Sequence, residues 1–166
     1  MSRWLRALVA LAAVIALLGA ATIAAGRLGW LQGQRPPDLG VVDGRLKAPS
    51  TTPNSVSSQA RLHPGHPRQR EAQIDPLAFR GDGAVAMARL AALVEATDGA
   101  HIVERRADYL YATFTTPLMR FVDDVEFWLD PVDNVIHVRS ASRVGHGDRG
   151  ANRARIEALR QRFEAG

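Results

Sequence analysis

Residues 122–140, VDDVEFWLDPVDNVIHVRS, contain the pattern that decides the fold. Apolar and polar residues alternate on both sides of a central segment, Asp130–Asn134, whose Asp, Pro and Asn residues are typical of turns. A connection this short joins neighbouring antiparallel strands. The stretch therefore predicts a β-hairpin with strands over Val122–Leu129 and Val135–Ser140.

The same alternation predicts which face of the sheet each side chain occupies. One face carries the apolar residues Val125, Phe127, Leu129, Ile136 and Val138, and the other carries Asp124, Glu126, Trp128, Val135, His137 and Arg139. If residues 131–134 form the loop, Trp128 lies opposite His137 and Glu126 lies opposite Arg139. The apolar face is then free to be covered by helices.

Two more strands and two helices complete the predicted domain. Asp82 offers an N-cap for a helix whose apolar residues recur at helical spacing, and Gly99 offers its C-terminal stop. A second amphipathic helix runs from about Gly150 to Phe163. The two further strand patterns cover Ile102–Arg106 and Tyr109–Thr115. We therefore predict an α+β fold for residues 79–166, a four-stranded antiparallel sheet with two helices on one face.

The N-terminal segment predicts a membrane anchor over residues 1–30. No charged residue occurs between Ala7 and Gly26, and a helix of about 20 residues matches the roughly 30 Å hydrocarbon core of a bilayer. Trp4 and Trp30 are spaced so that each ring reaches a headgroup layer. We therefore expect a retained transmembrane helix that contacts lipid through residues 4–30.

A cleaved signal peptide is the alternative interpretation of this segment. It has a basic start, an apolar core and small residues before Gly26, but no strict Ala-x-Ala site. Basic residues lie on both sides of the apolar run, which leaves the positive-inside bias nearly balanced. We favour a single-pass protein of the inner (plasma) membrane whose domain lies outside the cytoplasm.

Residues 31–78 are predicted to form a Pro-rich tether and strap. Seven of the nine prolines lie between Gln34 and Pro76, which disfavours regular helix and central strand. The stretch also contains apolar residues, among them Leu39, Val41 and Leu46. A simple linker lacks such residues, so we expect this segment to lie extended against the domain.

Composition limits the chemistry of the chain. Its 166 residues contain no cysteine, which excludes disulfides, thiolate zinc sites, iron–sulfur clusters and cysteine nucleophiles. The net charge is +4, and residues 1–30 supply +3 of it, so the remainder is nearly neutral and nucleic-acid binding is not expected. The histidines show no recognised ligand spacing, and serines occur without a nucleophile-elbow motif. We expect no metal and no cofactor.

An acidic segment followed by arginines allows two interpretations. Asp123, Asp124 and Glu126 could act as the carboxylates of a hydrolase or transferase, with arginines holding an anionic substrate. Alternatively, the opposite charges pair with one another, as Glu126 would with Arg139. We favour mutual pairing, because no catalytic geometry is specified by the sequence.

The second face of the predicted sheet is a candidate docking surface. It would present Tyr109, Tyr111, Trp128 and His137 as a flat aromatic patch. Such patches bind partners or ligands, although half-exposed strands also favour Tyr and Trp for packing reasons alone.

Several segments together resemble a known family. The segments are PNSVSSQ (53–59), FVDDVEF (121–127) and IHVRSASRVG (136–145), followed by Asp148, Gly150, Asn152 and Arg153. They resemble the bacterial and plastid family known as domain of unknown function 1499, over roughly residues 39–163. Members commonly carry cysteine where this chain has Ser55, so any thiol role is absent here.

The resemblance implies a set of polar positions rather than a reaction. So many polar positions in two adjacent segments would suit one hydrogen-bonded network. The matched residues are Asn54, Ser57, Asp123, Asp124, Glu126, Arg139, Ser142, Arg143, Asp148, Asn152 and Arg153. We expect an envelope module without catalytic activity that binds a small ligand or a protein, or that is purely structural.

Overall fold

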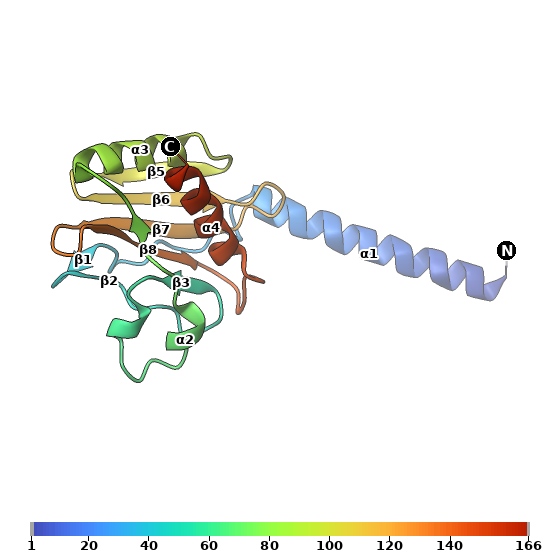
Figure 1. Cartoon of the computed structure of the whole chain (residues 1–166). Coiled ribbons are helices and arrows are strands. Elements are labelled where there is room, and N and C mark those ends of the chain that lie inside the picture. The colour runs from blue at the N-terminus through green and yellow to red at the C-terminus, as the bar shows by residue number, and fades with distance from the viewer. Residues whose placement is uncertain (1, 166) are drawn as a thin grey trace.

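The computed structural model describes residues 2–165, which form an α+β domain with one long helix extending away from it (Figure 1). In chain order the elements are α1 (Arg3–Arg27), β1 (Val41–Val42), β2 (Arg45–Leu46), β3 (Ser55–Ser57), the 3-10 helix η1 (Ala60–Leu62), α2 (Gln69–Ala72), β4 (Leu77–Ala78), α3 (Gly83–Glu95), β5 (Ala100–Arg105), β6 (Tyr109–Thr115), β7 (Val122–Asp130), β8 (Val135–Ser142) and α4 (Ala151–Glu164).

The predicted hairpin forms the centre of the main sheet. Strands β7 and β8 pair antiparallel with Trp128 opposite His137 and Glu126 opposite Arg139, which confirms the predicted register. Strands β6 and β5 continue the antiparallel order on the other side of β7. Register and strand order therefore follow from the alternating pattern of residues 122–140.

The sheet has six strands, so the prediction of four was wrong. The two additional strands come from the Pro-rich segment: β3 pairs Val56 with Ser140, and β4 pairs Leu77 with Ile136. Both lie along the outer edge of β8. Without them that edge would expose unpaired backbone N–H and C=O groups. Strands of two or three residues are too short to show alternation, which is why the sequence did not reveal them.

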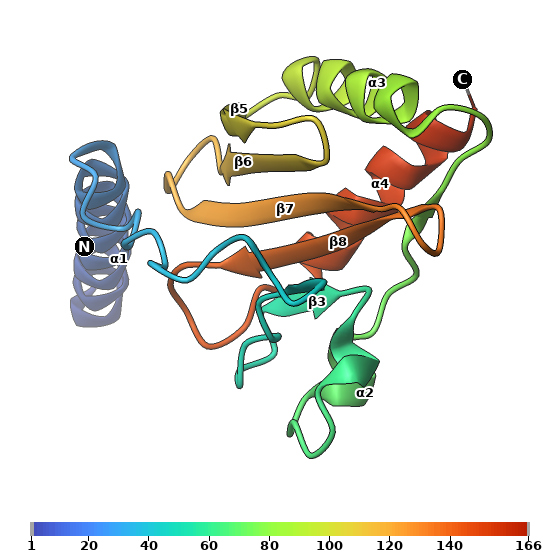
Figure 2. The same cartoon turned by 90° about the vertical axis from the view of Figure 1, so that its left-hand side faces the viewer.

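Helices α3 and α4 cover one face of the sheet, as predicted (Figure 2). Their apolar side chains pack with the inward-facing residues of the strands; the core includes Met87, Leu90, Val94, Leu110, Phe114, Val125, Phe127, Ile136, Val138, Ile156, Leu159 and Phe163. Asp82 caps α3 by accepting hydrogen bonds from the backbone N–H groups of Ala84 and Val85, at 2.7 and 3.0 Å. This packing supplies the main hydrophobic core.

Helix α3 ends at Glu95, four residues before the predicted stop at Gly99. Gly99 instead makes the turn into β5, with φ +76°. A Cβ atom at this position would lie 2.5 Å from the carbonyl oxygen of Thr115. Glycine is required by the close approach of two backbones rather than by the end of the helix.

The strap covers the second face of the sheet, which the sequence predicted to be open. Leu39, Val41 and Leu46 pack against the aromatic residues of the face, and Tyr109, Tyr111 and Trp128 are buried. The prediction of an open docking surface is therefore corrected: the aromatic face is a second, smaller core. Burying large aromatic rings under the chain's own strap removes apolar area from water.

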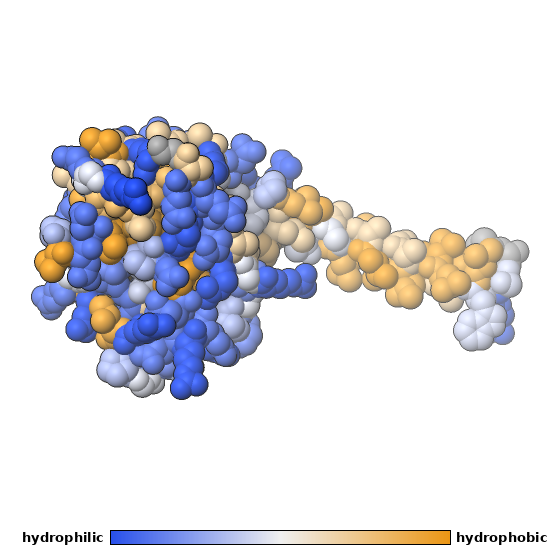
Figure 3. Space-filling view, viewed as in Figure 1, coloured by the Kyte–Doolittle hydropathy of each residue, from blue (hydrophilic) through white to orange (hydrophobic). Residues whose placement is uncertain are grey.

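Helix α1 is long and apolar enough to cross a membrane, with a mean hydropathy of 2.5 and no buried residue in its most apolar window. At 1.5 Å per residue its 25 residues extend about 37 Å. Figure 3 shows this apolar helix projecting from a largely hydrophilic domain surface. Length and composition alone also fit a signal sequence.

Candidate functional site

The predicted polar network is divided by the sheet into two clusters. Successive side chains of a strand point to opposite faces. Asp124 and Glu126 therefore lie beneath the strap, whereas Asp123 lies on the face covered by α4. We call the first group the strap-side cluster, composed of Tyr109, Tyr111, Asp124, Glu126, Arg139 and Arg143. We call the second the helix-side cluster, composed of Asn54, Asp123, Ser140, Ser142, Asp148, Asn152 and Arg155.

Glu126 and Arg139 form a buried ion pair in the strap-side cluster. The side chains are 0% and 3% exposed, and Arg139 Nη1 lies 3.4 Å from Glu126 Oε2. Glu126 Oε1 accepts hydrogen bonds from the Gly40 N–H at 2.7 Å and from the Tyr109 hydroxyl at 2.9 Å. Arg139 Nε donates to the Ala48 carbonyl at 3.2 Å. The backbone of the strap thus completes the hydrogen bonding of both charged groups.

Burial shifts the pKa values of this pair toward the neutral forms. Removal from water raises the pKa of Glu126, and Arg139, Gly40 and Tyr109 oppose that shift. Burial likewise lowers the pKa of Arg139. Burial, together with the neighbouring Glu126 carboxylate, also raises the pKa of Tyr109. The Gly40 N–H of the strap is thus one of the groups that favour the charged form of Glu126.

Asp124, Arg143 and Tyr111 form the second half of the strap-side cluster. Arg143 donates to both carboxylate oxygens of Asp124, at 3.0 Å from Nε and 2.8 Å from Nη2. The Tyr111 hydroxyl donates to Asp124 Oδ1 at 2.6 Å, and burial together with this carboxylate raises the pKa of Tyr111 to about 12. Arg35 of the strap lies over the Tyr111 ring at 4.5 Å from its centroid. Arg143 thus binds Asp124 in a bidentate ion pair, and Tyr111 donates a further hydrogen bond to the same carboxylate.

Asn152 is the centre of the helix-side cluster. Its side-chain amide donates to the Asn54 carbonyl at 3.0 Å, to Ser142 Oγ at 3.0 Å and to Asp148 Oδ2 at 2.9 Å. Asp148 also accepts from the backbone N–H of Asn152, which places this carboxylate at the start of α4. Burial alone would raise the pKa of Asp148, but the N–H groups that donate to its carboxylate outweigh burial and lower that pKa. The cluster joins the strap, β8 and α4.

Asp123 pairs with Arg155 in the same cluster. Arg155 Nη2 lies 2.5 Å from Asp123 Oδ2, and its Nη1 donates to Asn152 Oδ1 at 2.8 Å. Ser140 also hydrogen-bonds to Asn152. All three predicted carboxylates of the acidic segment thus have arginine partners, as mutual pairing predicts.

Two of the predicted positions lie outside both clusters. Ser57 is buried, and its hydroxyl accepts from the Gln59 N–H at 3.1 Å. Arg153 donates to the carbonyls of Glu71 and Gln73, at 2.8 and 2.9 Å, and so holds the α2 segment against α4. Both residues fix local backbone rather than join the buried networks.

His137 has neighbours that the sequence did not predict. Its Nδ1 lies 3.0 Å from Ser58 Oγ, its Nε2 lies 3.5 Å from Asp130 Oδ2, and its ring stacks on Trp128. Ser58 Oγ also accepts from the Val138 N–H at 2.9 Å, so this hydroxyl takes part in the edge pairing of β8. Burial lowers the pKa of His137 although Asp130 opposes it. The Ser58 hydroxyl therefore helps to hold the segment after β3 against β8.

Asp130, Asp133 and His137 lie close enough to hold a metal ion, with ligand atoms within 4.8 Å of one another. These three residues show no recognised metal-ligand spacing in the sequence. Asp130 also accepts from the Val132 N–H at 2.8 Å, which is the hydrogen bond of a turn. The turn hydrogen bonds from the Val132 and Asp133 N–H groups account for the position of Asp130.

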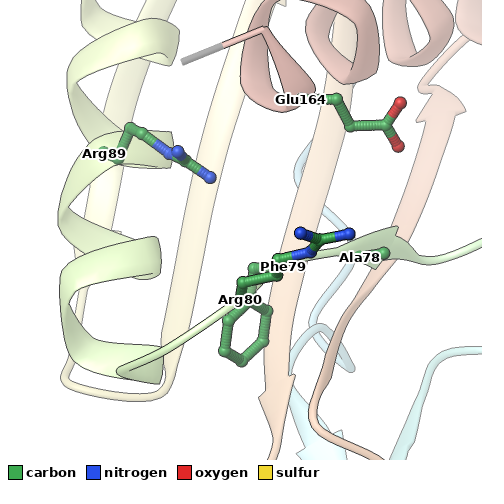
Figure 4. A pocket seen from close by; sticks show the side chains of 5 residues that line it. All are labelled: Ala78, Phe79, Arg80, Arg89 and Glu164. Atoms are coloured by element: carbon green, nitrogen blue, oxygen red, sulfur yellow. The ribbon is translucent and has the colours of Figure 1, made fainter.

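The described residues line at least five surface cavities, and one of them has a volume of about 530 Å³ (Figure 4). It lies between α3, α4 and the segment after β4, and its lining residues are Ala78, Phe79, Arg80, Arg89 and Glu164. A second, open cavity of about 440 Å³ is lined by strap residues, among them Gly40, Arg45, Ala48 and His63. Within residues 2–165, none of the five is lined by Asp123, Asp124 or Glu126.

Three residues of the networks, Gln59, Ser140 and Arg155, were missed among the predicted site residues. Gln59 Oε1 accepts from the Leu46 N–H at 2.8 Å, and its Nε2 donates to the Gly44 carbonyl at 2.9 Å, so Gln59 fixes the β1–β2 turn. Arg155 holds Asp123, as described above. Gln59 lies within the motif segment of residues 53–59, and that location was the signal available for it.

Comparison with known proteins supports the resemblance seen in the sequence. The family model described as "Protein of unknown function (DUF1499)" matches residues 45–163. No curated protein and no solved structure shows a significant match. The matched range includes every residue of both clusters.

Proposed function

Because the chain belongs to the DUF1499 family of proteins of unknown function, we propose its role from geometry: a single-pass membrane-anchored envelope module without catalytic activity. One observation carries the proposal. The carboxylates that a hydrolase or transferase would use are buried and paired with arginines. A general acid or nucleophile must reach its substrate, and none of the five cavities described above is lined by Asp123, Asp124 or Glu126.

The closed clusters support a structural role for the polar residues. Gly40 and Ala48 of the strap bond directly to the Glu126–Arg139 pair, so the segment that follows α1 is fixed to the sheet. The domain is thereby held close to the end of α1 rather than on a free tether.

Carbodiimide labelling of carboxylates tests the absence of a carboxylate active site. In the native full chain we expect Asp124 and Glu126 to remain unmodified, whereas Glu95, which is exposed on α3, is modified as the matched control. After unfolding in urea all three should react. Modification of Asp124 or Glu126 at the rate of Glu95 in the native state would favour the hydrolase or transferase alternative.

The anchor and its orientation form the second part of the proposal. We place α1 in the inner (plasma) membrane, with lipid contacts through residues 4–30 and the domain outside the cytoplasm. Val132→Cys provides a unique thiol in a cysteine-free chain, because Val132 is 88% exposed. A membrane-impermeant maleimide should label this variant in intact cells. Labelling only after lysis would contradict the orientation, and a mature mass lacking the N-terminal segment would indicate a signal peptide.

A small anion is a second candidate partner, favoured by the cavity of Figure 4. Arg80, in the segment after β4, and Arg89 of α3 line the same cavity beside Phe79 and Glu164, and neither arginine is in an ion pair of 4.0 Å or less within residues 2–165. Guanidinium groups suit carboxylate and phosphate ligands. We expect phosphate or citrate to raise the unfolding temperature of the native chain more than that of Arg89→Ala. Equal shifts in both would rule out this site.

A further inference from the structure

The domain-side end of α1 packs against a loop of the domain. Gly26 is buried there, and a Cβ atom added to it would lie 2.3 Å from the carbonyl oxygen of Met119. Met119 belongs to the β6–β7 loop, residues 116–121, which lies beside this end of the helix (Figures 1 and 2). The tip of the loop therefore lies level with Gly26 along the axis of α1, and Gly26 is the last residue of the uncharged run.

Hydrogen bonds close this loop at its base. The Thr116 N–H donates to the Phe121 carbonyl at 2.9 Å, and the Phe121 N–H donates to Thr116 Oγ1 at 2.9 Å. The Arg120 N–H also donates to the Thr116 carbonyl, at 3.2 Å. A loop closed in this way holds the side chains at its tip in fixed positions.

Large apolar side chains are exposed around this contact. Leu118 at the loop tip is 53% exposed, and Leu28 and Trp30, just after α1, are 67% and 76% exposed. Arg27 and Arg120 are exposed beside them. Apolar and aromatic side chains mixed with arginine are typical of the interfacial layer of a bilayer, where the basic groups meet anionic headgroups.

We infer that the β6–β7 loop is a second lipid-contacting surface, which lies in the headgroup layer beside Leu28 and Trp30 of the proposed anchor. The inference rests on the proposed anchoring of α1. The loop adjoins the apolar helix, which indicates that its binding partner is the lipid bilayer. If residues 7–26 span the hydrocarbon core, Met119 lies at the edge of that core. The domain then contacts the membrane at two places and has one fixed orientation on it.

Single-cysteine labelling tests this surface in the full chain. The natural sequence has no cysteine, so Leu118→Cys, Val132→Cys and Val14→Cys each carry one environment-sensitive fluorophore. The three variants are reconstituted into phosphatidylcholine–phosphatidylglycerol vesicles containing brominated lipid. Val132 lies in the hairpin at the far end of β7, whose nine residues place it about 30 Å from the loop. It is the matched exposed control.

We expect bromolipid to quench the Leu118→Cys fluorophore several-fold more than the Val132→Cys fluorophore. Equal quenching of these two labels overturns the inference, as does a blue-shifted Leu118→Cys label without bromolipid quenching, which would indicate a protein occupant. The Val14→Cys label separates this inference from the anchor. If it is quenched and Leu118→Cys is not, only the second contact fails; if it is not quenched, the anchor itself fails.

Discussion

Replacing Arg139 by alanine leaves Glu126 as a buried carboxylate without its charge partner. At the observed separation of 3.4 Å, the attraction between the two charges is about 5 kcal/mol at an effective dielectric constant of 20. Burial costs each ion several kcal/mol, so attraction and desolvation nearly cancel in the native pair. The variant keeps the cost of burying Glu126 and loses the attraction. We expect unfolding to be easier by about 3–5 kcal/mol.

Urea and thermal unfolding of the full chain in detergent, followed by near-ultraviolet circular dichroism, measure this effect. A domain of this size loses about 3–4 °C per kcal/mol, so the unfolding temperature should fall by roughly 10–20 °C. Arg105→Ala is the matched control, because Arg105 is exposed and pairs with Glu95 at the surface; we expect a loss below about 1 kcal/mol there.

The loss in Arg139→Ala should also depend on pH. Burial raises the pKa of Glu126, and removing Arg139 raises it further. A raised folded-state pKa means that the folded protein holds the proton more tightly, so stability is present at low pH and lost as pH rises through that pKa. The defect should therefore be smaller at pH 5 than at pH 8. A pH-independent loss no larger than that of Arg105→Ala would refute the buried ion pair.

Three further predictions concern other parts of the fold. Asn152→Ala removes donors to Asn54 and Ser142 and should lower the free energy of unfolding by about 2–3 kcal/mol in urea titrations; an unchanged midpoint would contradict the helix-side cluster. Gly99→Ala should lower the free energy of unfolding more than Gly65→Ala in the same assay. Both glycines have positive φ, but only at Gly99 would an added Cβ meet a backbone carbonyl, so equal losses would contradict this contact. Since the pKa of Tyr111 is raised from 10 to about 12, its contribution to stability is complete below pH 10 and is lost as pH rises through about 12; constant urea midpoints over that range would contradict it.

The sequence predicted the central hairpin because its alternation extends over both strands. Register and the pairing of Glu126 with Arg139 both follow from that pattern. Asp123 has the same parity as Val125, and this signal could have placed it on the helix side rather than with Asp124. A residue's neighbour in sequence is on the opposite face of a strand, so a run of three acidic residues could not form one site.

The strap could not be placed from sequence. Leu39, Val41 and Leu46 do not recur with a helical or strand period, so nothing indicated which face of the sheet they cover. The N–H and C=O groups of Gly40 and Ala48, which complete the buried ion pair, are backbone groups and leave no signature in residue type. The aromatic face was for this reason predicted to be open.

A tyrosine titration tests most directly whether the strap closes the second sheet face. The chain has two tyrosines, Tyr109 and Tyr111, and both are buried under the strap, so absorbance at 295 nm reports on these residues alone. We predict no ionisation near pH 10 in the folded protein, with Tyr111 titrating at about pH 12 and Tyr109 resisting ionisation still further. Unfolding in urea should return both to about 10. A folded protein in which either tyrosine ionises near pH 10 would contradict the closed strap.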